Sequence, residues 1–160
     1  MNNTFKLIIA IIIPVAVGAI SGFFTATGVE SWYQTINKPS WNPPGWIFGP
    51  VWTTLYVMMG IALFLVWKSD SSDVLKKTAI ALFAIQLILN FFWSFIFFDQ
   101  QQIGWALVEI IVMWFFILLT IFAFGNVSKL AAWLLVPYIS WVSFATILNY
   151  TIWKFWFQIF

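Results

Sequence analysis

Five long apolar stretches limit what this chain can fold into. They cover roughly residues 5–27, 46–67, 75–98, 103–125 and 130–153. A bilayer core about 30 Å thick is crossed by a helix of about 20 apolar residues, and each stretch reaches that length. Only 8% of the 160 residues are charged and 63% are hydrophobic, so the chain cannot cover itself with a polar surface. We therefore predict an all-α membrane protein, a bundle of five transmembrane helices in a single domain spanning residues 1–160.

The connections between these stretches indicate how the helices are arranged. Polar residues at 68–73, 99–102 and 125–129 form three short breaks, so helices that follow each other in the sequence should be antiparallel neighbours. The remaining connection, residues 28–45, is longer and is stiffened by prolines. Within it, Val29 to Ile36 could form a short helix with an apolar edge of Val29, Trp32, Tyr33 and Ile36. We expect this connection to pack as a lid over one end of the bundle.

The lysines predict an orientation in the membrane. Five of the seven fall on the side of the N-terminus, and only Lys38 and Lys154 fall on the other side. Cytoplasmic loops carry the excess of basic residues, which places the N-terminus in the cytoplasm and the C-terminus outside. We expect the membrane to be that of a bacterial cell. The absence of arginine and cysteine is compatible with this expectation.

The composition excludes several kinds of function. The chain has neither histidine nor cysteine, so the commonest metal ligands, general bases and thiol nucleophiles are missing. We expect no metal site and no required cofactor. The net charge of +2 is too small and too scattered for a nucleic-acid surface. The expected partners are the lipid membrane and a hydrophobic small molecule.

Aromatic and polar side chains recur at helical spacing in three of the stretches, which predicts an aromatic cavity between these helices. The three stripes are Trp52, Tyr56 and Met59; Gln86, Asn90, Trp93 and Phe97; and Trp141, Ala145 and Leu148. An amide in hydrocarbon is costly unless it is paired, so Asn90 should face the bundle interior. There it either bonds neighbouring helices or makes a polar contact inside the cavity, and the sequence leaves both readings open. For Glu109, near the start of its helix, structural and functional readings are likewise open.

Small residues and prolines give two further expectations. Gly18, Gly22 and Ala26 form a stripe of small residues that lets another backbone approach closely. The stripe could pack against a second copy of the chain, but we expect it to pack against another helix of the same chain. Pro14 and Pro137 should kink the first and fifth helices.

One weak lipid-recognition pattern lies near the C-terminus. Leu148, Tyr150 and Lys154 fit a spacing proposed for sterol contact, although an aromatic residue and a lysine at a helix end are also ordinary interfacial anchors.

Several of these motifs together resemble the translocator protein family, also called tryptophan-rich sensory proteins. The residues that carry the resemblance are Trp41-Asn42-Pro43-Pro44, Gly45-Trp46-Ile47-Phe48, Val51-Trp52, Leu55-Tyr56, Gln86-Leu87, Leu89-Asn90, Phe97-Phe98, Gly104-Trp105-Ala106-Leu107-Val108, Pro137-Tyr138, Trp141, Phe144-Ala145 and Leu148-Asn149. They occur in order along essentially the whole chain. Glu109 is not universal in that family.

The resemblance implies a five-helix bundle, commonly a homodimer, in which the loop at 28–45 closes a cavity that binds porphyrins such as protoporphyrin IX. It implies a receptor or sensor, and leaves a light- and oxygen-dependent porphyrin-degrading enzyme or a porphyrin or sterol transporter as alternatives. The tryptophans matching Trp52 and Trp141 are implicated in that catalysis. The expected ligand-binding residues are Trp41, Pro43, Trp52, Tyr56, Asn90, Trp93, Trp141, Ala145 and Leu148, and Lys38 is a candidate cation for the porphyrin propionates.

Overall fold

The computed structural model describes residues 1–158 and is helical almost throughout. The elements are α1 (Asn3–Glu30), η1 (Trp32–Gln34), η2 (Gly45–Ile47), α2 (Phe48–Trp67), α3 (Asp73–Ser94), η3 (Phe95–Asp99), α4 (Ile103–Gly125), α5 (Lys129–Leu134) and α6 (Val136–Phe157). They supply five helical spans that are long and apolar enough to cross a membrane, as the sequence predicts.

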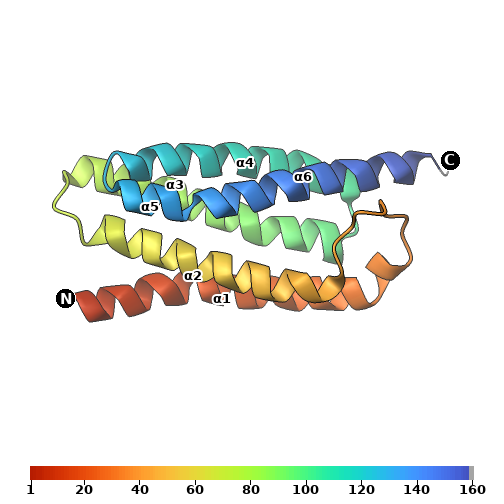
Figure 1. Cartoon of the computed structure of the whole chain (residues 1–160), viewed down its shortest axis with the longest axis horizontal. Coiled ribbons are helices and arrows are strands. Elements are labelled where there is room, and N and C mark those ends of the chain that lie inside the picture. Colours follow the sequence, from red (N-terminus) through yellow and green to blue (C-terminus); the bar gives the residue numbers. More distant parts are fainter. Residues whose placement is uncertain (159–160) are drawn as a thin grey trace.

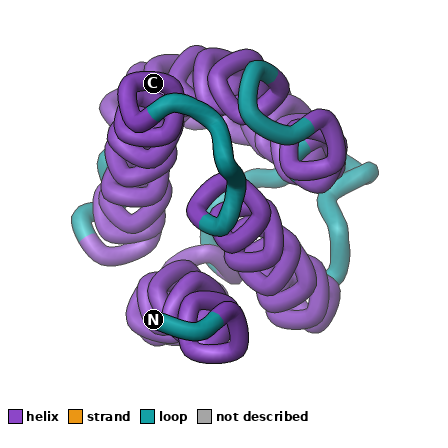
Figure 2. The backbone as a smooth tube through the Cα atoms, turned by 90° about the vertical axis from the view of Figure 1, so that its left-hand side faces the viewer, coloured by secondary structure: helices purple, strands orange, loops and turns teal. Residues whose placement is uncertain are grey.

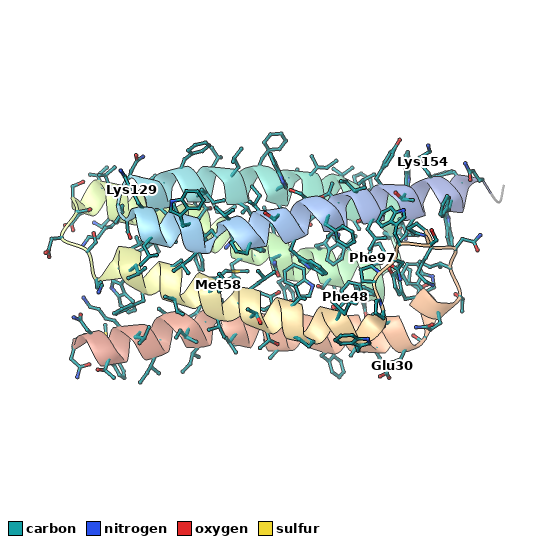
Figure 3. All side chains as sticks on the ribbon, in the orientation of Figure 1. Glu30, Phe48, Met58, Phe97, Lys129 and Lys154 are labelled. Carbon is teal, nitrogen blue, oxygen red and sulfur yellow. The ribbon has the colours of Figure 1, made fainter. Side chains whose placement is uncertain are left out.

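The spans form one elongated bundle (Figure 1). The N-terminus, the α2–α3 turn and the α4–α5 turn lie at one end, and the connection between α1 and α2 lies at the other. Lys129 and Lys154 are accordingly at opposite ends of the bundle (Figure 3). The unequal division of lysines between the two ends therefore holds in the folded chain.

α1 is the least embedded span. It packs mainly against α2, whereas α3 packs against α4, and α4 against α6. Seen along the bundle, α1 lies at its edge (Figure 2). In its most apolar window 17% of the residues are buried, against 28–39% in the other four spans. α1 is consequently the span that contributes least to the interior of the bundle.

The two prolines behave differently. The fifth span is interrupted at Leu135, between α5 and α6, two residues before Pro137. The interruption agrees with the expected kink, because proline fits the first turn of a new helix. α1, in contrast, continues through the buried Pro14 as one helical segment.

The lid differs from its expected form. Because α1 runs to Glu30, the expected helix over Val29 to Ile36 is reduced to one 3₁₀ turn, Trp32–Gln34. Its apolar edge is nevertheless turned inward: Tyr33 and Ile36 are buried against Phe97 and Phe98. We call residues 31–44 the lid from here on.

A buried polar network joins α2, α3 and α6. The Tyr56 hydroxyl donates to Oδ1 of Asn90 at 2.5 Å, Nδ2 of Asn90 donates to the Tyr138 hydroxyl at 2.8 Å, and that hydroxyl donates to Oε1 of Gln86 at 2.7 Å. The Asn90 amide is thus paired within the hydrocarbon region by hydrogen bonds to neighbouring helices. Of the two roles that the sequence left open for Asn90, this is the bonding of neighbouring helices.

Candidate ligand cavity

An aromatic cavity lies under the lid, between α2, α3 and α6. Its volume is about 30 Å³. The rings around it are Tyr33, Phe48, Trp52, Trp93, Phe97, Phe98, Trp141 and Phe144, and Thr25, Ala145, Leu148, Asn149 and Ile152 complete the wall. A cavity needs roughly 10–15 Å³ to hold a water, so the rings leave space for only a water or two.

The rings close the cavity by packing on one another, both between spans and along single spans. Phe48 of α2 meets Trp141 of α6 edge-on at 6.2 Å between ring centroids, and Trp141 meets Phe144 at 5.5 Å. On the opposite side Trp93 stacks on Phe97 at 5.2 Å. Phe48 and Phe97, which both line the cavity, lie on different helices near the lid end of the bundle (Figure 3). Such ring pairs contribute about 0.5–1.5 kcal/mol each beyond their buried area, so the closed form is well stabilised.

A π-helical turn supplies two of these rings. η3 continues α3 from Phe95 to Asp99, and the consecutive residues Phe97 and Phe98 are both buried. A regular α-helix places consecutive side chains about 100° apart, whereas the wider π turn keeps both rings in the wall.

The lid is tied down by polar contacts of its own. The Tyr33 hydroxyl donates to Oδ1 of Asn42 at 2.6 Å. Burial raises the pKa of Tyr33, so this hydroxyl stays protonated and remains a donor. The Lys38 ammonium donates to the carbonyl oxygens of Tyr33 and Ile36, and burial lowers the pKa of this lysine. Lys38 is therefore engaged by the lid backbone, not directed at the cavity.

The indole N–H groups of two tryptophans in the cavity wall differ in whether they have a hydrogen-bond partner. Nε1 of Trp93 donates to Oδ1 of Asn149 at 3.1 Å, and Nδ2 of Asn149 donates to the Ile103 carbonyl at 3.1 Å. Nε1 of Trp141 is buried and has no hydrogen-bond partner among the described residues. An unpaired buried donor is costly, and a ligand acceptor in the cavity would remove that cost.

The structure places five of the expected ligand-binding residues around the cavity: Trp52, Trp93, Trp141, Ala145 and Leu148. Four others lie elsewhere. Tyr56 and Asn90 are occupied by the polar network, Pro43 lines a hollow on the outer face of the lid, and Trp41 is half-exposed with its ring against Phe144.

Several wall residues were missed by the sequence reasoning. Phe144 and Asn149 share the inward face of α6 with Trp141, Ala145 and Leu148, so extending that stripe would have found them. Tyr33 was expected on the apolar edge of the lid but not in the cavity wall, because its place there depends on how the lid folds back. Phe48, at the start of α2, carried no such signal.

The sterol-pattern residues do not form one surface. Leu148 points inward and is buried, whereas Tyr150 is exposed and the Lys154 ammonium lies over the Tyr150 ring. That pair has the arrangement of an interfacial anchor.

A second hollow lies between α1 and the first half of α2. This α1–α2 groove has a volume of about 650 Å³ and shares Thr25, Phe48 and Trp52 with the aromatic cavity. Gly18 and Gly22 of the small-residue stripe line it. A Cβ atom at Gly18 would collide with the Tyr56 ring, so this glycine serves packing within the monomer, whereas one at Gly22 would meet no atom within 4 Å.

Within the described residues, no group of three or more His, Cys, Asp or Glu side chains lies close enough together to hold a metal ion. Both carboxylate oxygens of Glu109 are buried without a hydrogen-bond partner there. Glu109 lines neither the aromatic cavity nor the α1–α2 groove.

The amino-acid sequence matches a known family of proteins. The sequence model described as TspO/MBR family matches residues 10–154. A tryptophan-rich protein TspO of Chlorobaculum tepidum is 50% identical over 141 residues, covering 86% of this chain and 87% of that protein. The translocator protein of Homo sapiens is 45% identical over 124 residues, covering 77% and 73%, and a tryptophan-rich sensory protein of Cereibacter sphaeroides is 39% identical over 121 residues, covering 76% and 74%.

Proposed function

Since the chain belongs to the TspO/MBR family of membrane proteins, we propose that it is a receptor that binds planar hydrophobic ligands, porphyrins above all, in the aromatic cavity. The observation that carries the proposal is the cavity wall, where eight aromatic rings converge from the lid and three spans. Broad planar ligands are held by offset stacking on such rings. Mostly apolar walls with few polar groups are typical of small-molecule sites.

Binding in this cavity requires that the rings part. A volume of about 30 Å³ is far below the roughly 300–1,000 Å³ of pockets that hold drug-sized molecules. We infer that the lid is the part of the wall that moves, because it contributes Tyr33 and, unlike the rest of the wall, does not belong to a membrane-spanning helix. The ligand therefore binds an opened form, and its affinity is reduced by the cost of opening.

The lysine distribution supports an orientation for this receptor. The end that holds the N-terminus, Lys68, Lys76, Lys77 and Lys129 faces the cytoplasm, and the lid faces the opposite side of a bacterial cell membrane. In this orientation the lid covers the cavity on the outer side.

Protoporphyrin IX titration tests the binding proposal. Binding is followed by quenching of tryptophan fluorescence in the purified chain, in detergent or nanodiscs. The double variant Trp52→Phe/Trp141→Phe should bind at least about tenfold more weakly, a difference of about 1.4 kcal/mol.

The matched control is Trp133→Phe, because Trp133 is exposed on α5 and outside the cavity wall. It should leave the affinity unchanged. Equal affinities for the double variant and the unsubstituted protein would remove the cavity from consideration as the porphyrin site.

Photo-oxidative porphyrin degradation is a second candidate, supported by the presence of Trp52 and Trp141 in the same wall. The chemistry would come from the illuminated ligand and oxygen, with tryptophan as an oxidisable partner. A new absorbing product that forms under light and needs either tryptophan would establish it. Bleaching at the same rate with the double variant would reject it.

A further inference from the structure

An apolar hollow lies between α1 and α3, over the buried Leu63 of α2. Every residue that lines it is apolar, and its volume is about 490 Å³. Ile13 of α1 and Ala84 and Ile88 of α3 are exposed on membrane-spanning helices, so the hollow opens toward the hydrocarbon of the bilayer. We call this space, between residues 13–17 and 80–92, the α1–α3 hollow.

The α1–α3 hollow has the length of one leaflet. Twelve residues separate Ile80 from Phe92 in its wall, which is about 18 Å along a helix. Half of a bilayer core of about 30 Å is about 15 Å. Ile80 lies near the start of α3, so the hollow belongs to the leaflet on the side of the N-terminus and the α2–α3 turn (Figure 1). A lipid acyl chain in that leaflet therefore matches the hollow in length and polarity.

Lysines lie on the same helix faces as the hollow, toward the membrane surface. Lys6 precedes Ile13 by seven residues, which is two turns of α1 on one face. On α3, Lys76 and Lys77 precede Ile80 by four and three residues, which places both of them one turn before it on the same face. Both walls of the hollow thus continue into ammonium groups at one end.

The three ammonium groups keep donors free for a headgroup. Nζ of Lys6 lies 5.8 Å from the centroid of the Trp67 ring. Nζ of Lys76 donates to the Ser69 carbonyl at 3.0 Å, and Lys77 is exposed. An ammonium carries three N–H donors, so that contact of Lys76 leaves two of them for other acceptors. Phosphate oxygens are acceptors of the required kind.

This end of the bundle carries an excess of positive charge. Its acids are Asp70 in the α2–α3 turn and Asp73 at the start of α3, on the face that carries Lys76 and Lys77. Against these two acids stand five lysines: Lys6, Lys68, Lys76, Lys77 and Lys129. Basic groups next to membrane helices attract anionic lipids, so the headgroup favoured here is one with a net negative charge.

We propose that the α1–α3 hollow, together with Lys6, Lys76 and Lys77, binds one anionic phospholipid. Phosphatidylglycerol has the required chemistry. One of its acyl chains lies in the hollow, its phosphate accepts hydrogen bonds from the ammonium groups, and its second chain stays in the bilayer. The site is separate from the ligand cavity, because the hollow shares no lining residue with the aromatic cavity or with the α1–α2 groove.

Native mass spectrometry of the full chain in detergent tests the headgroup. The protein is titrated with phosphatidylglycerol or with phosphatidylcholine that has the same acyl chains. The first molecule of phosphatidylglycerol should bind at least about tenfold more tightly. Lys6→Gln/Lys77→Gln should weaken phosphatidylglycerol binding about thirtyfold and leave phosphatidylcholine binding unchanged. Lys154→Gln, at the opposite end of the bundle, is the charge control and should change neither affinity.

A filling variant tests the hollow. Ala84→Leu takes space from the acyl chain and should weaken the binding of both lipids at least about fivefold, because their chains are the same. Ala81→Leu, at an exposed position of α3 outside the hollow, is the matched control and should bind like the unsubstituted protein. Leucine is a good helix former and both positions are exposed, so both variants should fold.

Photolabelling in nanodiscs locates the bound chain. Phosphatidylglycerol with a diazirine in one acyl chain should label residues 13–17 and 80–92, and Ala84→Leu should reduce this labelling at least about fivefold. Equal affinities for the two lipids would overturn the anionic headgroup, and labelling spread evenly over all five spans would overturn the hollow. A lipid-free dimer that Ala84→Leu dissociates would show that a second copy of the chain covers the hollow, and this result would also overturn the proposal.

Discussion

The aromatic cavity and the α1–α2 groove share Phe48 and Trp52, yet one measures about 30 Å³ and the other about 650 Å³. The difference follows from side-chain size. Around the cavity, large rings reach across from facing elements and fill the space between helices. Along the groove, glycines on both helices leave that space open. The tryptophan-rich part of this chain is therefore the closed part, and binding there demands movement, whereas the glycine-rich part is already open.

The largest effect should come from the place where α1 and α2 touch. A Cβ atom at Gly60 would lie 2.5 Å from Cα of Ile11 and 2.8 Å from the Ala10 carbonyl oxygen, both backbone atoms that cannot move aside. Gly60→Ala should therefore cost about 3 kcal/mol, at the upper end for an overpacked core. Gly49→Ala, in open space on the same helix, should cost nothing measurable. Thermal unfolding in detergent compares the two, and equal melting temperatures would mean that the helices are not in contact at Gly60.

A filled cavity should weaken porphyrin binding. Ala145 lines the cavity and not the groove, so Ala145→Leu occupies space that a planar ligand needs. Affinity for protoporphyrin IX should fall at least about tenfold, or about 1.4 kcal/mol. Ala81→Leu, which enlarges an exposed position of α3 outside the cavity wall, is the control and should bind with unchanged affinity. Unchanged affinity in Ala145→Leu would show that the ligand does not occupy the space beside Ala145.

The spans could be predicted from the sequence because each depends only on local composition. Twenty apolar residues between polar breaks predict a membrane helix whatever its neighbours are, and Pro137 predicts a break near its own position. The cavity stripes on α3 and α6 were predictable for the same reason, since Trp93 and Trp141 lie on faces that periodicity identifies.

Contacts between elements could not be predicted in this way. Gly18 and Gly22 form one stripe, but only Gly18 meets a ring, because the Tyr56 side chain fills the space beside it. Tyr56 lies one turn after Trp52 and was expected on the cavity wall. It turns to Asn90 instead, since a buried hydroxyl needs a partner and the amide of α3 is within reach. Helical periodicity identifies a face, and the neighbouring helix decides what that face contacts.

The polar network beside the shared wall should have an intermediate effect. Asn90→Ala removes the acceptor of the Tyr56 hydroxyl and a donor to Tyr138, and should cost about 1–2 kcal/mol, since pairs within membranes contribute about 0.6 kcal/mol on average and an orphaned group adds more. Adding Tyr56→Phe should recover part of that loss, because the orphaned hydroxyl is gone. Strictly additive losses in this double-mutant cycle would show that the two side chains are not coupled.

The smallest effect concerns the lid that closes the cavity and leaves the groove open. Tyr33→Phe removes the hydrogen bond to Asn42 and keeps the ring against Phe97 and Phe98. A bond of about 1 kcal/mol predicts lid opening about fivefold more often, measured as faster amide hydrogen exchange in residues 35–44. Burial raises the pKa of Tyr33, so its hydroxyl remains protonated, and the ratio between variant and unsubstituted protein should stay constant from pH 6 to pH 9. Tyr150→Phe, at an exposed tyrosine of α6, is the control. Unchanged exchange in Tyr33→Phe would mean that ring packing alone holds the lid, and the cavity would then open only when the aromatic wall itself separates.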